Sequence, residues 1–308
     1  MGRNEEHLAF KPLLWFGLLA AFLLQGCASG TVNHYNRGVE LYDKGRIPDA
    51  IHEYKLAAEL NPGDPRPSFN LAVIYQDAGR IDEARQLYRS ILERHPGYAP
   101  ALANLASIEE MKGDLEDAER TYRRAQEVNP DDASAASQYG FFLLRQDRTD
   151  DAEAAFREAI RRNKSCANAY FGLGTIALQQ GKPSEALRQF KEAIHYNPSD
   201  LEAHLKAADV LVMEGKKEEA VAMLRKACSL DHARADVFLR FGKLLEEQGA
   251  WKDAEEVIET ALKHGAPPAE CNVELNRIYE KLAEQALASS REGANTVPSI
   301  TSAKQESN

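Results

Sequence analysis

The sequence has little of what enzymes and metal proteins use. It has four cysteines among 308 residues, and none of them forms a C-x-x-C pair. It contains no H-E-x-x-H zinc motif and no P-loop, and its eight histidines are scattered. No serine, histidine and acid recur together at a shared spacing. The sequence therefore predicts no catalytic residue, no metal site and no cofactor. Apart from Cys27, the cysteines are predicted to be small buried thiols.

Long hydrophobic runs and an excess of basic charge are also absent. The twelve apolar residues LLWFGLLAAFLL at residues 13–24 fall short of the roughly 20 that a membrane-spanning helix needs. The formal net charge is −10, and an acidic chain of this kind is a poor ligand for nucleic acid. These absences argue against an integral membrane protein and against a nucleic-acid partner.

The short apolar run has the size of a signal-peptide core. It leads directly into LQGC at residues 24–27, which resembles the lipobox of bacterial lipoproteins. The resemblance implies a signal peptide over residues 1–26, acylation of Cys27 as the first mature residue, and a lipidated tether over residues 27–30. Ala28 stands where enteric lipoproteins of the inner membrane carry aspartate, so the resemblance implies a lipid anchor in the outer membrane that faces the periplasm. The alternative is a buried helix with an incidental cysteine.

The most regular feature of the chain is a period of 34 residues. One alanine recurs at this spacing seven times: Ala50, Ala84, Ala118, Ala152, Ala186, Ala220 and Ala254. Glycine or alanine lies twelve positions before each of them, and an acidic residue lies directly before each. Glycine also lies five positions before six of the alanines, while Asp147 takes that place in the fourth copy. The pattern predicts two helices per period that approach closely at the small residues, with a left-handed turn residue after the first helix.

This pattern resembles the tetratricopeptide repeat, a helix–turn–helix unit of the same length. The resemblance implies an all-α fold, a right-handed α-solenoid of seven units without gaps over residues 31–268. The units are 31–64, 65–98, 99–132, 133–166, 167–200, 201–234 and 235–268. Proline ends the second helix in four of them, and Lys164, His232 and Ala266 stand at the corresponding place in the others.

The residues after the repeats divide into two segments. Residues 269–288 carry an apolar stripe of Leu275, Ile278 and Leu282, which predicts a capping helix for the end of the solenoid. Residues 289–308 are rich in Ser, Asn, Thr and charge without periodicity, and they are predicted to form a disordered tail.

The resemblance also implies a concave groove lined by the first helices. Asn36, Asn70 and Asn104 lie two positions before the small residue in the first three copies and are predicted to form a ladder along this groove. An asparagine offers a donor and an acceptor, which suits the backbone of an extended peptide. Apolar side chains at neighbouring positions complete the predicted partner-binding groove: Tyr35, Phe69, Phe141 and Phe171.

Together these features predict a protein–protein interaction scaffold, held at the membrane through acylated Cys27. We expect an assembly factor for an envelope machine, in pilus assembly, secretion, polysaccharide export or cell-wall metabolism. The pilotin-like lipoproteins of type IV pilus assembly resemble the chain in architecture. The alternative is a periplasmic, chaperone-like receptor that binds extended peptides in the asparagine-lined groove. In both cases the predicted partners are proteins or extended peptides, without nucleic acid, and the predicted protein is not an enzyme.

Overall fold

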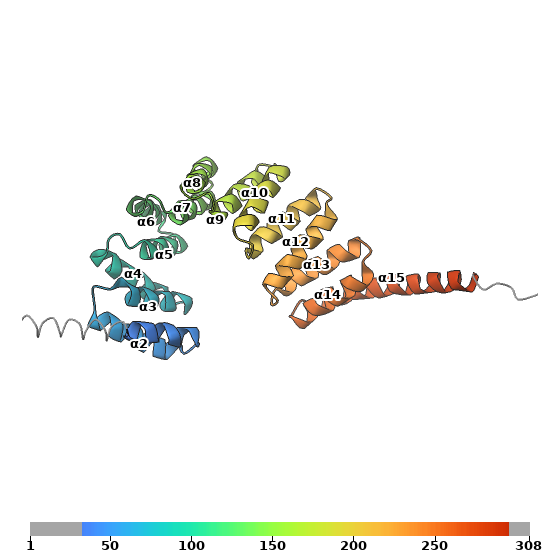
Figure 1. Cartoon of the computed structure of the whole chain (residues 1–308), viewed down its shortest axis with the longest axis horizontal. Helices are drawn as coiled ribbons and strands as arrows, with labels where there is room; N and C mark the ends of the chain where they lie inside the picture. The colour runs from blue at the N-terminus through green and yellow to red at the C-terminus, as the bar shows by residue number, and fades with distance from the viewer. Residues whose placement is uncertain (1–32, 296–308) are drawn as a thin grey trace, which may run out of the picture. The chain divides into compact units, whose positions relative to one another are not determined.

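The structure is a computed structural model that describes residues 33–295. Within this range the chain forms α-helices joined by short turns, and it contains no strand (Figure 1). The predicted all-α fold class is confirmed.

The helices follow the 34-residue period. The first helices of the repeats are the helix over residues 33–43, α3 (Pro65–Asp77), α5 (Ala99–Met111), α7 (Ala133–Arg145), α9 (Ala167–Gln179), α11 (Leu201–Met213) and α13 (Ala235–Glu247). The second helices are α2 (Ile47–Leu60), α4 (Ile81–Arg94), α6 (Leu115–Val128), α8 (Thr149–Arg162), α10 (Pro183–Tyr196), α12 (Lys217–Leu230) and α14 (Trp251–Lys263). The acid before each repeat alanine lies in the first turn of a second helix, where the helix dipole favours negative charge. A final helix, α15 (Pro268–Asn295), follows the last repeat.

The helices form two compact units. The first unit ends at Asn163 and contains the helices up to α8, and the second begins at Lys164 and contains α9 to α15. The prediction treated residues 31–268 as one continuous array, and the structure divides it within the fourth copy. The division falls in the turn between α8 and α9, where Lys164 replaces the proline of the repeat. Because repeats contact mainly their sequence neighbours, each unit keeps a core of its own.

Small residues bring the two helices of each repeat together. All seven repeat alanines have no exposed surface. On the facing helix, a Cβ atom added to Gly140 would lie 2.8 Å from the Phe156 ring, and one added to Gly174 would lie 2.6 Å from the Phe190 ring. A side chain at either glycine would therefore displace the aromatic ring that fills the repeat core. The predicted packing role of the small residues is confirmed.

The turn after each first helix has the predicted left-handed backbone. The six repeat glycines have φ between 69° and 80°. Asp147 takes the same conformation with φ 57°, as the one non-glycine residue of positive φ in the described part of the chain. Aspartate enters this conformation more readily than most residues, so the fourth copy keeps its turn without glycine.

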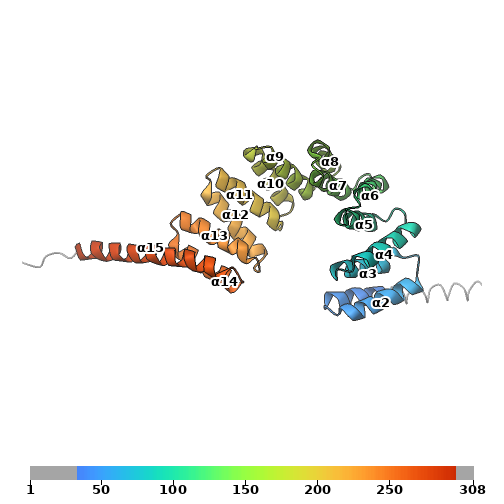
Figure 2. The same cartoon turned by 180° about the vertical axis from the view of Figure 1, so that it is seen from behind.

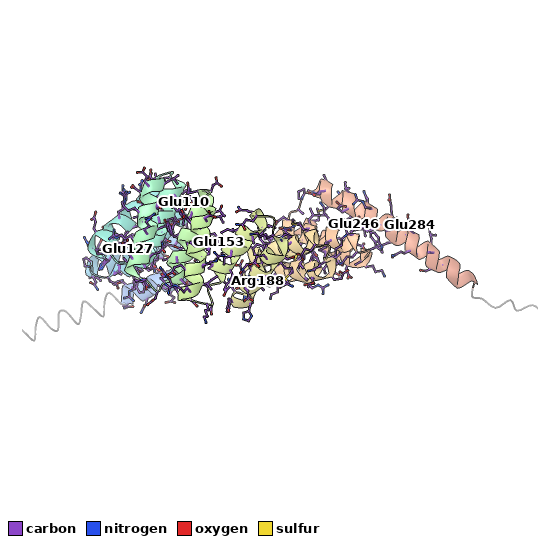
Figure 3. The ribbon with its side chains drawn as sticks, turned by 90° about the horizontal axis from the view of Figure 1, so that it is seen from above. Glu110, Glu127, Glu153, Arg188, Glu246 and Glu284 are labelled. Carbon is purple, nitrogen blue, oxygen red and sulfur yellow. The ribbon has the colours of Figure 1, made fainter. Side chains whose placement is uncertain are left out.

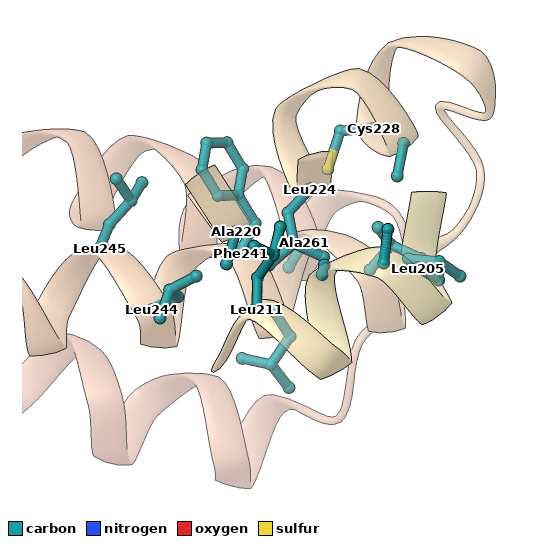
Figure 4. Packing of buried hydrophobic residues seen from close by; sticks show 14 of the residues in the cluster. Leu205, Leu211, Ala220, Leu224, Cys228, Phe241, Leu244, Leu245 and Ala261 are labelled. Carbon is teal, nitrogen blue, oxygen red and sulfur yellow. The ribbon is translucent and has the colours of Figure 1, made fainter. Parts of the chain in front are cut away.

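Each unit has a hydrophobic core that crosses several repeats. In the second unit the core extends from Ala177 in α9 to Ile278 in α15, and Figure 4 shows its leucines, Phe241 and alanines side by side. Cys228 and Cys271 belong to this core, whereas Cys166 is half-buried, and none of the three forms a disulfide. Burial raises the pKa of Cys228 to about 11, as expected for an unreactive thiol in apolar surroundings.

Ion pairs join neighbouring repeats on the surface. They connect residues about one period apart: Arg85–Asp114 at 2.6 Å, Lys112–Asp82 at 2.5 Å, Arg145–Glu110 at 2.5 Å, Lys217–Glu247 at 2.8 Å and Lys243–Glu270 at 2.5 Å. Exposed pairs of this kind each contribute little to stability, about 0–1 kcal/mol. They specify which faces of adjacent repeats meet, while the apolar cores supply most of the stability.

The last helix is longer than predicted. The expected cap ended at residue 288, whereas α15 continues to Asn295, so residues 289–295 of the predicted disordered tail are helical. The hydroxyls of Ser289 and Ser290 each donate to a carbonyl one turn earlier, at 2.9 Å. The start of α15 packs against α14, and the part around Glu284 extends beyond the repeats (Figures 1 and 3, and Figure 2 from behind). Residues 296–308 lie outside the described range.

The buried alanines lead to a prediction about stability. Ala118→Leu adds three carbon atoms where α5 and α6 meet, and overpacking should lower the free energy of unfolding by about 1–3 kcal/mol. Ala283 is exposed on α15, so Ala283→Leu serves as the matched control and should have little effect. Urea titration followed by circular dichroism measures both changes. Equal midpoints for the two variants would show that Ala118 does not lie at a close helix crossing.

Candidate functional groove in the first unit

The three asparagines of the predicted ladder differ in their surroundings. Asn36 is exposed, whereas Asn70 and Asn104 are half-buried. The amide of Asn104 donates to the hydroxyl of Tyr88 on the preceding second helix, at 2.9 Å. One repeat earlier, burial raises the pKa of Tyr54, and the nearby Asn70 side chain acts to lower it. Asn104 therefore joins adjacent repeats, in addition to any contact with a ligand.

The sequence contains a signal for this role that the groove interpretation missed. The repeats with a tyrosine in the second-helix core, Tyr54, Tyr88 and Tyr122, are each followed one copy later by an amide side chain, Asn70, Asn104 and Gln138. The next three copies have Phe156, Phe190 and Leu224 in the core, and the residues that follow are Gly172, Lys206 and Arg240. A phenolic hydroxyl buried between repeats requires a polar partner, whereas phenylalanine and leucine do not. In the sequence the amides follow the tyrosines, and the structure shows the pairing at Tyr88, whereas the Tyr122 hydroxyl donates to Glu110 at 3.2 Å.

Tyr88 is the centre of a short hydrogen-bond chain. Its hydroxyl accepts from Asn104 on α5 and donates to Gln76 Oε1 on α3 at 3.1 Å. Burial of the ring raises the pKa of Tyr88 to about 12, so the hydroxyl keeps its proton at physiological pH. These two hydrogen bonds thus join three successive helices, α3, α4 and α5, through the fully buried side chain of Tyr88.

A pocket lies beside this hydrogen-bond chain. It has a volume of about 300 Å³. Residues of α3, α5, α6 and the start of α7 line it: Phe69, Ala99, Pro100, Ala103, Asn104, Ala125, Asp132, Ser134, Ala135 and Gln138. We call it the Phe69 pocket. It brings together two predicted groove residues, Phe69 and Asn104, from different repeats, and it adds Gln138 of the same ladder.

The ring of Phe69 is held from two sides. Its centroid lies 5.8 Å from that of Tyr88 and 5.6 Å from that of Tyr98, which it meets edge to face. Such aromatic contacts favour one ring orientation. Phe69 is itself only half-buried, so part of a well-ordered aromatic surface remains open to the pocket.

Asp132 is a pocket residue that the sequence analysis did not identify. Its Oδ1 caps α7 by accepting the N–H groups of Ser134 at 2.8 Å and Ala135 at 3.3 Å. An aspartate before a helical pattern is a recognisable capping signal. That it lines the same pocket as Asn104, at the other end of the same repeat, depends on how the helices pack and has no signal in the sequence.

The other predicted site residues lie outside this pocket. Tyr35 packs near Tyr54, with ring centroids 6.1 Å apart, and the Arg66 guanidinium lies 4.8 Å from its ring centroid. Phe141 meets Phe156 edge to face at 4.8 Å. Phe171 belongs to the second unit, where its ring lies 5.6 Å from Phe190. Cys27 lies outside the described residues.

A second cavity of the first unit is lined by charged residues that form ion pairs within the chain. It measures about 480 Å³ and includes Arg123, Tyr139 and Arg148. Burial acts to raise the pKa of the nearby Glu119, but hydrogen bonds from Arg148, Tyr139 and Arg123 lower it to about 2. These charges already have partners within the chain, which makes the Phe69 pocket the stronger candidate for binding. Figure 3 labels Glu110 and Glu127 on the same unit.

Residues 33–295 form neither a metal site nor a bilayer-spanning helix. No three side chains of His, Cys, Asp and Glu gather there as metal ligands. None of the helices in that range has the length and apolar character needed to cross a bilayer.

The paired helices, the small crossing residues and the left-handed turns define a tetratricopeptide-repeat protein. The family of the cilia and flagella-associated protein 70 C-terminal domain, a tetratricopeptide-repeat family, matches residues 48–278. The chain belongs to this family. The comparison with curated proteins found no match.

Solved structures show the same fold. A tetratricopeptide repeat protein from Parabacteroides merdae has 23% identity and a TM-score of 0.55, over 82% of this chain and 99% of its own. TTC0263 from Thermus thermophilus has 27% identity and a TM-score of 0.50, over 59% of this chain and 99% of its own. PilF from Pseudomonas aeruginosa has 24% identity and a TM-score of 0.54, over 72% and 96%. These similarities show the fold of this chain.

The hydrogen-bond chain leads to a second prediction. Tyr88→Phe removes one hydroxyl and leaves Asn104 and Gln76 without their partner, which should cost about 1–2 kcal/mol of unfolding free energy. Tyr98→Phe is the matched control, because the Tyr98 hydroxyl makes no hydrogen bond within residues 33–295. Chemical denaturation of both variants measures the difference. An unchanged midpoint for Tyr88→Phe would show that the hydrogen bond between Asn104 and Tyr88 does not stabilise the fold.

Proposed function

We propose that the protein is a lipid-anchored scaffold whose first unit binds an extended segment of a partner protein in the Phe69 pocket. The observation that carries this proposal is the pocket itself, which brings an ordered aromatic ring and two amide side chains together from three successive repeats. An aromatic surface beside paired donors and acceptors suits a peptide, whose side chains and backbone it can contact together. The protein then acts by binding and not by catalysis.

The pocket leaves hydrogen-bonding groups for such a segment. Asn104 uses one amide hydrogen on Tyr88, so its carbonyl oxygen and second amide hydrogen remain for a partner backbone. Gln138 contributes a second amide to the lining. Two amides in one groove can pair with an extended backbone whatever its side chains are, while Phe69 provides the apolar contact.

The anchor is proposed from the sequence. The apolar run at residues 13–24 followed by LQGC supports cleavage before Cys27 and acylation of this residue. Since the first repeat begins only a few residues later, the first unit is placed close to the membrane surface. We propose an outer-membrane lipoprotein that faces the periplasm and assists assembly of an envelope machine, such as a pilus, a secretion or polysaccharide-export system, or a cell-wall enzyme complex.

A chaperone-like peptide receptor is the second candidate. The amides of the Phe69 pocket favour it, because contacts to a peptide backbone do not select one sequence. The two functions differ in the number of partners. A scaffold holds one partner in a fixed ratio, whereas a receptor holds many unrelated segments.

Photo-crosslinking tests the groove. A benzoylphenylalanine at Gln138 should cross-link a partner protein in the native membrane, whereas the same group at the exposed Ala283 of α15 should not. Phe69→Ala should reduce the Gln138 cross-link by about tenfold or more, as expected for loss of an aromatic anchor. Circular dichroism confirms the fold of each variant. One cross-linked protein supports the scaffold and many support the receptor, while an undiminished cross-link in Phe69→Ala would place binding elsewhere.

The anchor has its own test. Cys27→Ser removes the only thiol that the lipobox resemblance assigns to acylation, so the variant should lose fatty-acid labelling and leave the membrane fraction or remain unprocessed. Metabolic labelling with a fatty acid, followed by immunoprecipitation, measures this loss. Cys166→Ser is the matched control and should be labelled like the wild type. Equal labelling of Cys27→Ser would rule out the lipid anchor.

A further inference from the structure

The Phe69 pocket has one formally charged side chain in its lining, and it is a carboxylate. Asp132 shares the lining with Asn104, Ser134 and Gln138, and no lysine, arginine or histidine takes part. A lining of acidic and uncharged polar groups, with no basic group, attracts a cation and repels a carboxylate. The electrostatic character of the pocket therefore restricts which segment it accepts.

The equivalent aspartate of another repeat shows that this charge is left unpaired. Asp64 caps α3 just as Asp132 caps α7, two repeats apart. Asp64 is neutralised by Arg66, whose guanidinium lies 2.7 Å from its carboxylate. The residue that corresponds to Arg66 in the fourth copy is Ser134, which donates only its backbone N–H to Asp132. The carboxylate of Asp132 thus makes no ion pair among the described residues; the Arg162 guanidinium, which is paired with Glu158, donates to the backbone carbonyl of Asp132 at 3.4 Å.

The helix ends around the pocket do not make it an anion site. A helix N-terminus binds anions through its free N–H groups, and both α5 and α7 begin here. At α7 the carboxylate of Asp132 already accepts those of Ser134 and Ala135. At α5 the N–H groups of Ala101 and Leu102 donate to the Tyr98 carbonyl at 3.1 and 3.2 Å, and proline at the second position of the helix has none. The donors that an anion would require are already engaged.

The remaining walls suit the stem of a long basic side chain. Phe69, Pro100, Ala103 and Ala135 supply apolar surface, along which lysine and arginine bury their methylene groups while the charged end stays polar. The ring of Phe69 can also attract a cation placed over its face. A volume of about 300 Å³ is at the lower end for ligand pockets, which fits one side chain of a larger partner.

We propose that the Phe69 pocket accepts a lysine or arginine side chain of the partner segment, with its charged group at Asp132 and its stem against Phe69. The proposal rests on the proposed function of the groove and adds the chemistry of the segment that enters it. It distinguishes this pocket from one that would bind the carboxylate at the C-terminus of a peptide.

The test uses the detergent-solubilised full chain and a positional-scanning library of 12-residue peptides. In this library one position at a time is fixed as Lys, Arg, Glu or Leu. Asp132→Asn is the informative variant, because asparagine caps a helix about as well as aspartate and only the charge is lost. Asp131→Asn is the matched control: it removes the same charge from the exposed neighbouring residue, which does not line the pocket.

Fluorescence anisotropy then measures the affinity of the protein for the best peptide and for a copy in which norleucine replaces the basic residue. Norleucine should weaken binding about fivefold to the wild type and to Asp131→Asn, and should make no difference to Asp132→Asn. Added salt should reduce the preference in the wild type.

Three outcomes would overturn the proposal. Equal affinity of both peptides for the wild type, or a preference for Glu or a free C-terminal carboxylate, would remove the cation site and leave the peptide groove intact. Binding that is unaffected by Phe69→Ala would place the peptide outside the pocket. Failure of every library peptide to bind would remove the peptide groove, and the cation site with it.

Discussion

The whole structure depends on one steric constraint, the close approach of two helices at a small residue in each repeat. Ala118, Ala152 and their equivalents are completely buried, and glycine or alanine faces them across the helix pair. This approach leaves room for one large side chain beside the crossing, such as Tyr88 or Phe156, which is also fully buried. Because each helix pair is closed in this way, its outer faces can pack only against the next repeat. The tertiary structure therefore consists of neighbour contacts, and the array can divide into two units at the turn between α8 and α9.

The large side chain at the crossing also determines whether the neighbouring helices must supply a hydrogen-bond partner. Tyrosine carries a hydroxyl into the junction between repeats, where it needs a polar partner: Asn104 of the following first helix for Tyr88, and Glu110 of the preceding first helix for Tyr122. Phenylalanine has no hydroxyl and needs no hydrogen-bond partner, and the amide is absent one repeat after Phe156 and Phe190. The first unit thus acquires a polar line beside apolar surface as a consequence of how its repeats are joined. In the proposed function, the groups that contact a peptide backbone are ones that first serve stability.

The candidate site adds a charge that the packing does not need. The cap of α7 would be formed equally well by serine or asparagine, and at the start of α3 the equivalent carboxylate, Asp64, is paired with Arg66. At the start of α7 the carboxylate of Asp132 makes no ion pair and lines the same pocket as Phe69 and Asn104. Such a residue can be changed with little cost to the fold, which is the property expected of a group that serves binding.

The sequence by itself determined the period, the repeat type and most helix positions, because small residues, turn glycines and helix-end prolines act within one repeat and are visible at fixed spacing. It also predicted Phe69 and Asn104 as groove residues, and both line one pocket of the structure. It did not reveal that Asn104 is bound to Tyr88, that Asp132 joins the same pocket, or that α15 continues to Asn295. The division of the array after Asn163 was equally hidden. Each of these depends on contacts between residues one or more repeats apart, or on weak preferences summed along a helix, and only the tertiary structure brings such residues together.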